Sequence, residues 1–195
     1  MLKRALDIIV SLMGLILLSP FFLVVALLIR LDSPGPAIFS QTRVGRNGKP
    51  FPLYKFRSMI QDADMLRKPL SKVELSAVSF QQKDDPRITR LGRFLRRGFD
   101  ELPGLLNVLR GDMSLVGPRP EVPDVVNLYS EREKIRLKVK PGITGLAIIK
   151  GRGDLTVQET LDWDIYYVEH RCFTMDLKIL FATLWVVLVT GKGAR

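Results

Sequence analysis

The chain has 195 residues, a formal net charge of +10 and 47% hydrophobic residues. That length corresponds to one domain, or to one domain with a membrane element. Its single cysteine, Cys172, and single histidine, His170, exclude an intrachain disulfide, a cysteine zinc site and a multi-histidine centre within one chain. The excess of Lys and Arg favours polyanionic partners: nucleic acid, anionic lipid or phosphorylated substrates. Chemistry in this chain must therefore rest on carboxylates, Lys, Arg, hydroxyls and hard metal ions.

The apolar residues are concentrated in residues 8–29, which form 22 positions without a charge. At about 1.5 Å per residue, a helix of this length covers a hydrocarbon core of about 30 Å. Ser19 and Pro20 interrupt the run, and a proline there kinks or breaks a helix. Both flanks are basic, so the positive-inside rule does not set an orientation. The residues alone leave two interpretations open: a re-entrant helix–break–helix with both ends in the cytoplasm, and a kinked spanning helix.

The segments that follow are assigned from composition and periodicity. Residues 36–42 and 51–57 are predicted as strands, because aromatic and aliphatic residues are interleaved with charges there. Helices are expected, in chain order, at residues 60–76 (broken by Pro69), 88–97, 101–110, 121–139 and 156–172, with a loop at 77–87. The helix at 88–97 is amphipathic and cationic, because its apolar residues share one face.

A second apolar run covers residues 179–189 and is too short to span a membrane. It is expected to form either an interfacial helix with Trp185 as an anchor or an ordinary core helix, and the two interpretations are equally open. A cationic tail at residues 191–195 follows it and suits an anionic membrane surface.

Asp100 and Glu101 are the leading candidates for chemistry. Pro103 is tolerated only in the first turn of a helix, so it predicts a helix start at about Asp100. Outward-pointing N–H groups at such a start depress the pKa of a carboxyl group and attract phosphate. A carboxylate can attack a phosphoryl group, and a neighbouring carboxylate can hold Mg²⁺. The plainer interpretation is that the two acidic residues only cap the helix.

Two other segments carry cations in constrained settings. Pro118 and Pro120 fix φ on both sides of Arg119, so this stiff segment either presents the guanidinium to a phosphate or planar ring, or simply forms a rigid turn. Lys55 lies between two aromatic residues on the second predicted strand. The sequence contains no P-loop and no dinucleotide-binding fingerprint.

Seven motifs in a fixed order resemble the bacterial sugar transferase family, the monotopic phosphoglycosyl transferases. The resemblance covers nearly the whole chain and is carried by KRALD at 3–7 with the internal Ser19-Pro20, YKFRSM at 54–59, DPR at 85–87 with LGRFLR at 91–96, DELP at 100–103, NVLRGDMS at 107–114, GPRP at 117–120 and KPGITGL at 140–146.

This resemblance implies transfer of a sugar-1-phosphate from a nucleotide diphosphate sugar, usually UDP-linked, to a polyprenyl phosphate such as undecaprenyl phosphate. The products would be polyprenyl-diphosphate-sugar and UMP, in the first membrane step of glycan or exopolysaccharide assembly. It implies that Asp100 is the nucleophile of a covalent phosphosugar intermediate, and that Glu101 is its partner and a ligand of Mg²⁺. The residues expected to bind substrate are Lys55, Arg87, Arg96, Pro118, Arg119 and Pro120.

The resemblance also implies an architecture and a place in the cell. We expect a mostly helical α+β protein with a re-entrant membrane hairpin at residues 1–32 and amphipathic interfacial helices. A cytosolic, membrane-associated catalytic domain would occupy residues 33–195. It would lie on the cytoplasmic face of a bacterial inner membrane, as the catalytic core alone, and as a monomer or a homodimer. Its partners would be the two substrates and phospholipid, with no nucleic acid.

The sequence departs from the family pattern in a few places. The spacing before Asp100 is one residue shorter than usual, which leaves Arg96 and Arg97 as alternatives for one phosphate contact. Gly104 and Ile148 stand where the family often has Gln. A different kind of function remains open from the residues alone: a membrane-tethered basic protein that binds nucleic acid or acts as a scaffold.

Overall fold

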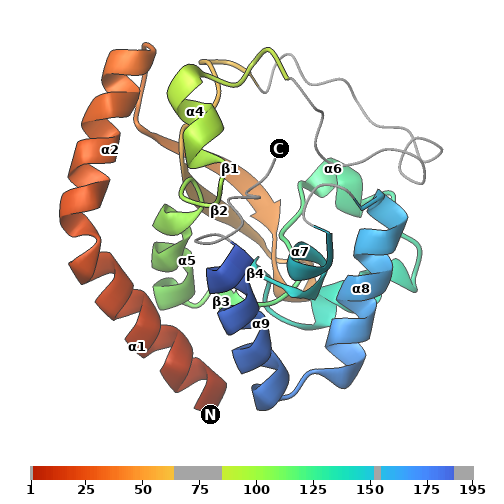
Figure 1. Cartoon of the computed structure of the whole chain (residues 1–195). Helices are drawn as coiled ribbons and strands as arrows, with labels where there is room; N and C mark the ends of the chain where they lie inside the picture. The colour runs from red at the N-terminus through yellow and green to blue at the C-terminus, as the bar shows by residue number, and fades with distance from the viewer. Residues whose placement is uncertain (1, 64–84, 152–154, 187–195) are drawn as a thin grey trace.

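The computed structural model describes residues 2–63, 85–151 and 155–186. It is a mostly helical α+β fold, with helices on both sides of short central strands (Figure 1). The elements in chain order are α1 (Leu2–Leu17), α2 (Ser19–Asp32), β1 (Ile38–Val44), η1 (Arg46–Gly48), β2 (Pro50–Phe56), α4 (Arg90–Leu95), η2 (Leu102–Gly104), α5 (Leu105–Arg110), β3 (Ser114–Val116), α6 (Pro123–Val126), η3 (Glu133–Lys138), β4 (Gly142–Thr144), α7 (Leu146–Gly151), α8 (Val157–His170) and α9 (Phe173–Trp185).

The helices α1 and α2 run one after the other along one side of the molecule (Figure 1). They are bent by 61° at the break, where Pro20 stands in the first turn of α2 and its missing N–H is not needed. The Ser19 hydroxyl donates a 2.8 Å hydrogen bond to the carbonyl of Ile16, the acceptor that proline leaves free. The predicted break is therefore confirmed. Among the described helices none alone has the length and apolar composition for a span, whereas α1 and α2 together pass that test.

Polar residues near the start of α1 attach it to the rest of the molecule. Lys3 donates a 2.7 Å hydrogen bond to Asp176 of α9, and Arg4 donates to two carbonyls in the last turn of α5 at 2.6 and 2.9 Å. Asp7 is buried and accepts two 3.0 Å hydrogen bonds from β3. A cation at a helix C-terminus is favourable because of the helix dipole, so the Arg4 contacts stabilise the last turn of α5.

The end of α2 is attached to the same domain in a different way. Here a side chain of the domain donates hydrogen bonds to backbone carbonyls just after the helix. Buried Arg57, just after β2, donates to the carbonyls of Ser33 and Pro34 at 2.6 and 2.7 Å. The α2 residues Val25 and Ile29 pack in one buried cluster with Phe56 and Leu95. Both ends of the α1–α2 pair are thus held by one domain.

The strands β1 and β2 form an antiparallel hairpin, in register from Ile38 opposite Phe56 to Val44 opposite Pro50. At its tip Asn47 and Gly48 have φ values of 57° and 77°, a left-handed conformation that these two residue types tolerate. The two predicted strands are confirmed. The hairpin presents Lys55 at the end nearest the candidate site.

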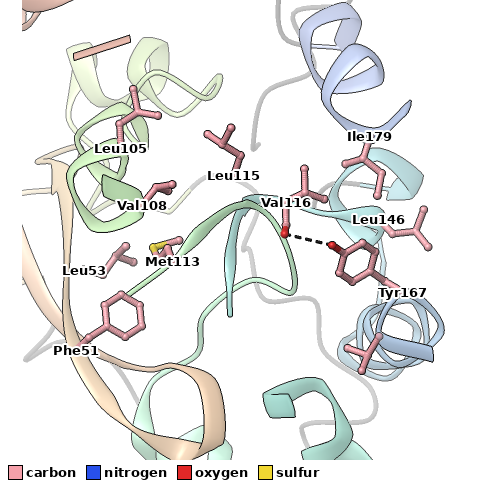
Figure 2. Packing of buried hydrophobic residues seen from close by; sticks show 11 residues of the cluster. Phe51, Leu53, Leu105, Val108, Met113, Leu115, Val116, Leu146, Tyr167 and Ile179 are labelled. Carbon is pink, nitrogen blue, oxygen red and sulfur yellow. Dashed lines mark hydrogen bonds between the residues drawn. The ribbon is translucent and has the colours of Figure 1, made fainter. Parts of the chain in front are cut away.

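The main core lies between β2, α5 and β3 on one side and α7, α8 and α9 on the other (Figure 2). Its buried members are Phe51, Leu53, Leu105, Val108, Met113, Leu115, Val116, Leu146, Tyr167, Val168 and Ile179. The Tyr167 hydroxyl donates a 3.3 Å hydrogen bond to the Val116 carbonyl within this core, so a buried polar group is satisfied and α8 is linked to β3. The strand β3 pairs in parallel with β4.

Several helix predictions need correction. Residues 121–139 do not form one helix, because α6 ends at Val126 and η3 begins at Glu133. Ser130 and Glu133 hydrogen-bond each other reciprocally between the two, which starts a new helical turn. The predicted 88–97 helix is shorter, as α4, whereas the 156–172 helix is confirmed as α8 with a capping box at Thr156.

The last helix, α9, begins earlier than predicted, at Phe173. It has features of both a core helix and an interfacial helix. Ile179 is buried, while Phe181 and Trp185 are 70% and 64% exposed. Most of the predicted 60–76 helix and 77–87 loop lies outside the described residues, as do residues 187–189 and the cationic tail.

Candidate active site

Asp100 and Glu101 lie in a tight turn between α4 and η2. Gly98, at a φ of 124°, lets the chain reverse, and the N–H groups of Asp100 and the residue before it both bond to the carbonyl of Leu95. The Phe56 N–H donates a 2.9 Å bond to the Asp100 carbonyl, which docks this turn on the end of β2. The side chains of this acidic pair are therefore displayed by a backbone held from two sides.

The helix start that was expected at about Asp100 lies slightly later in the chain. The first helical turn is a 3₁₀ turn that begins at Leu102, and Glu101 makes no side-chain capping bond to it. Pro103 does stand in the first turn, as predicted, but the acidic pair lies just before it. The reason is that the turn after α4 uses Asp100 to close onto Leu95 and β2. Asp100 thus lacks the capping N–H groups that were expected around it.

Glu101 joins cations from two distant segments. Its Oε1 accepts from Lys55 Nζ of β2 at 3.1 Å and from an Arg119 Nη at 2.7 Å. Burial lowers the pKa of Lys55, with the Glu101 charge acting in the opposite direction, and the same charge raises the pKa of Arg119. Both side chains thus contact Glu101 directly, and the Glu101 charge favours the protonated form of each.

Arg96 rather than Arg97 faces Asp100. Its Nε is buried with no hydrogen-bond partner among the described residues, and its pKa is lowered by burial while Asp100 raises it. The Arg97 guanidinium instead lies over the ring of Phe94, 5.7 Å from its centroid, and Arg97 is exposed. The one-residue shortening in the sequence thus leaves Arg96 on the site side of the turn.

Burial and the charge of Glu101 raise the pKa of Asp100 to about 6, while Lys55, Arg96 and Arg119 act to lower it. The sequence predicted a depressed pKa, so this expectation is wrong in sign. The physical reason is that desolvation penalises the ionised form, and no helix N–H group compensates for it. At neutral pH the carboxylate is still mostly ionised, and it is a stronger base than an ordinary Asp.

The segment that carries Arg119 is held through four consecutive carbonyls. Those of Pro118 and Arg119 accept from the Gly142 N–H at 2.9 Å and from Arg136 at 2.7 Å. Those of Pro120 and the next residue accept from Arg43 at 3.1 Å and from a β1 N–H at 2.8 Å. The expected stiffness from two prolines is thus reinforced by tertiary hydrogen bonds on every carbonyl.

Arg87 is engaged with its own neighbour. Its guanidinium forms a two-pronged ion pair with Asp85, with bonds of 2.9 and 2.6 Å, and a further bond to the carbonyl of Ala63. This pair stabilises the turn that precedes α4. The charge of Asp85 also acts on Arg96 and raises its pKa, so Arg87 is linked to the site through Asp85. The role of Arg87 in substrate binding stays a prediction.

The space between these groups is small. A cavity of about 10 Å³, roughly one water, is lined by Lys55, Glu101, Gly104, Arg119, Pro120 and neighbours from β2 and β4. A larger cavity, at about 690 Å³, lies elsewhere, between the hairpin tip, α6 and η3, and contains none of the predicted site residues. Glu101 thus occupies the space beside Lys55 and Arg119.

The acidic pair fits part of a Mg²⁺ site. No three His, Cys, Asp or Glu side chains gather as a ligand set within the described residues. Mg²⁺ is commonly bound by one or two carboxylates together with substrate phosphates and water. Asp100 and Glu101 provide the oxygen donors for that mode, and the ion would complete its shell from a diphosphate.

Arg136 and Asp164 are two further residues near the site that were not predicted from the sequence. Both side chains are only 2% exposed and lie 2.5 Å apart. A signal was available, because Asp164 belongs to the apolar stripe of α8 with Leu161, Ile165 and Val168. A carboxylate on the buried face of a helix needs a partner, and only the tertiary structure identifies it.

Comparison with known proteins agrees with this geometry. Residues 1–190 match the model of the bacterial sugar transferase family. The chain is 46% identical over 99% of its length to the galactosyl transferase CpsE of Streptococcus agalactiae and 44% identical over 96% to the undecaprenyl-phosphate galactose phosphotransferase of Salmonella typhimurium. It is 45% identical over 98% to the exopolysaccharide production protein PSS of Rhizobium leguminosarum.

The chain covers 43% and 40% of the first two relatives and 98% of the third. With a family match over 190 residues and a near full-length relative, the chain belongs to the bacterial sugar transferase family.

Proposed function

We propose that the protein transfers a sugar-1-phosphate from a nucleotide diphosphate sugar, with UDP as the expected nucleotide, to a polyprenyl phosphate. The observation that carries this proposal is the position of Asp100, a carboxylate without a hydrogen-bonded partner among the described residues. It lies beside Glu101 and in the field of three cations. The name of the Salmonella relative supports undecaprenyl phosphate as the acceptor and galactose phosphate as a transferred group.

The reaction is proposed to proceed in two displacements. In the first, an Asp100 oxygen attacks the phosphorus that carries the sugar, the bond to the bridging oxygen breaks, and UMP leaves with that oxygen. In the second, a phosphate oxygen of polyprenyl phosphate attacks the same phosphorus and the Asp100 carboxylate is released. One site can thereby serve a soluble donor and a membrane-bound acceptor in turn.

The surrounding residues have distinct proposed roles. Lys55, Arg96 and Arg119 neutralise charge on the phosphoryl oxygens as the new bond forms. Glu101, with Asp100, would hold Mg²⁺, which when bound supplies positive charge to the diphosphate. If Glu101 moved toward a bound Mg²⁺ ion, Lys55 and Arg119 would become available to bind substrate phosphates.

We also propose that α1 and α2 form a re-entrant membrane element at residues 1–32, with the catalytic domain from residue 33 on the cytoplasmic face of the bacterial inner membrane. Both ends of the pair bind the same domain, which a spanning helix could not do. With arms of 16 and 14 residues and a 61° bend, the apex would lie about 11 Å below the plane of the two ends, well short of the hydrocarbon core of about 30 Å.

Exposed apolar side chains support this placement. Thirteen large hydrophobic residues of α1 and α2 are exposed, among them Leu17 at 71% and Leu23 at 74%. Such residues recur on α4, which packs against α2, and at the end of α9, with Phe94 and Trp185 as examples. We assign α4 and α9 as interfacial helices, because an apolar patch of this extent needs a cover.

Mass spectrometry of the intact protein tests the mechanism. Enzyme mixed with a UDP-sugar and Mg²⁺, without acceptor, should release UMP and gain one phosphosugar on the peptide that contains Asp100. Polyprenyl phosphate should then remove the adduct. Asp100→Asn should form no adduct, whereas the exposed control Asp124→Asn should behave as wild type. Release of UMP only with acceptor present, and no adduct, would favour direct transfer. Salt-sensitive binding of DNA or RNA, indifferent to Asp100, would favour the nucleic-acid alternative.

A further inference from the structure

A buried ion pair lies directly behind the segment that carries Arg119. Arg136 of η3 donates 2.5 Å hydrogen bonds to Asp164 of α8 and to the Tyr129 hydroxyl. The nitrogen that binds Asp164 also donates a 2.7 Å bond to the Arg119 carbonyl. A single guanidinium thus joins η3, α8 and the backbone of a site residue.

Stability alone does not account for this arrangement. Removing two charges from water carries a desolvation cost that their attraction often fails to recover, and well-packed apolar residues are frequently as stable. A buried pair of this kind is therefore informative when one of its members also binds a functional segment. Here the third bond of Arg136 ends on the residue whose side chain contacts Glu101 at 2.7 Å.

The geometry shows how the effect reaches the site. Prolines on both sides of Arg119 restrict φ at residues 118 and 120, so the orientation of the Arg119 peptide is the main remaining freedom in this segment. Arg136 holds the carbonyl of that peptide. Arg43 holds the next carbonyl from the other side. The direction in which the Arg119 side chain leaves the backbone is thereby set.

We propose that Arg136 and Asp164 are positioning residues, which orient Arg119 toward the reacting phosphate through its carbonyl. They touch no substrate themselves. This inference rests on the proposed phosphosugar transfer, because Arg119 is assigned there to charge neutralisation. A misplacement of a positioned group by about 1 Å can cost about 100-fold in rate.

The test compares Arg136→Lys and Asp164→Asn with a matched pair on the same two segments. Arg132 and Asp162 form an ion pair at 3.2 Å, with side chains that are 71% and 47% exposed, so Arg132→Lys and Asp162→Asn serve as controls. We expect the buried variants to lower kcat for UDP-sugar turnover by about 10- to 100-fold, with the KM for polyprenyl phosphate unchanged. The control variants should remain within about 2-fold of wild type.

A double-mutant cycle separates positioning from a general structural role. In an Arg119→Lys background, Arg136→Lys should lower kcat by less than about 2-fold, because the group that it orients is already altered. Additive losses, or an unchanged kcat in folded Arg136→Lys, would overturn the inference. If the Arg136 and Asp164 variants misfold, Tyr129→Phe provides the test instead, because it removes one hydrogen bond to Arg136 without removing a charge. This variant should lower kcat by about 3-fold or more. If wild type itself shows no turnover, the proposed function fails instead.

Discussion

Replacing Asp100 with asparagine should make the folded protein more stable while it abolishes turnover. The substitution preserves size and removes a charge that the fold disfavours. Burial and Glu101 raise the pKa of Asp100 from 3.8 to about 6. Since one pKa unit corresponds to about 1.4 kcal/mol, the ionised carboxylate costs up to about 3 kcal/mol of folding free energy at neutral pH. Partial exposure of the side chain makes this an upper value.

The sign and the pH window follow from the direction of the change. Because the folded-state pKa lies above the unfolded one, stability is lost as pH rises from about 4 through about 6. Asp100→Asn should therefore gain about 1 kcal/mol at about pH 4.5 and up to about 3 kcal/mol at about pH 7.5. For a chain of this size, the larger gain corresponds to about 6 °C or more in Tm.

Denaturant and thermal unfolding in detergent micelles measure this difference. The buffers should lack divalent metal and substrate, because either would stabilise the ionised carboxylate. Asp124→Asn, an exposed position on α6, should change stability by only about 0.5 kcal/mol. Equal or lower stability of Asp100→Asn near neutral pH, or a gain that does not shrink toward acid, would refute the reasoning. A gain in stability together with a loss of activity is the expected result for a catalytic carboxylate that the fold desolvates.

Four further outcomes are expected. Arg96→Ala should lower kcat/KM for the donor by at least about 100-fold, and Arg97→Ala by less than about 3-fold, as measured by UMP release. The activity of the wild-type enzyme should fall below about pH 6, because Asp100 becomes protonated there. Bound metal would shift this loss of activity to lower pH, so the profile is measured at several Mg²⁺ concentrations. Activity that stays constant down to about pH 5 at every Mg²⁺ concentration would contradict the role of Asp100 as the nucleophile. Exhaustive chelation and Glu101→Gln should each remove most activity while circular dichroism stays unchanged, and full activity after chelation would disprove the metal requirement. Leu2→Cys, in a Cys172→Ser background, should be shielded from an impermeant maleimide in intact cells. The same cysteine should become labelled when Ala-Ala replaces residues 19–20, because the straightened helix would then span the membrane. Labelling from the periplasm without that replacement would contradict a re-entrant helix pair.

Features that depend on local rules were predictable from the sequence. Pro20 had to interrupt a helix, and the interleaved apolar and charged residues of 36–42 and 51–57 indicated the two strands of the hairpin. The periodic apolar residues of 156–172 produced α8, with the Thr156 cap at its start. The acidic pair, the stiff Pro-Arg-Pro segment and Lys55 were likewise recognisable by residue type, because proline geometry and carboxylate chemistry belong to the residues themselves.

The tertiary structure decided what those residues experience. A pKa depends on burial and on charges that lie close in space, so Asp100 could not be assigned a raised value before Glu101, Lys55, Arg96 and Arg119 were placed around it. Likewise, the 121–139 segment was expected as one charged helix. Its Arg136 instead turns inward to Asp164, a partner 28 residues away that local propensity does not report. Whether both ends of α1–α2 meet one domain also depends on hydrogen bonds across more than a hundred residues, such as Lys3 to Asp176. Local sequence preferences determined most of the helices and strands, whereas long-range packing determined the pKa values of their side chains and the residues that they contact.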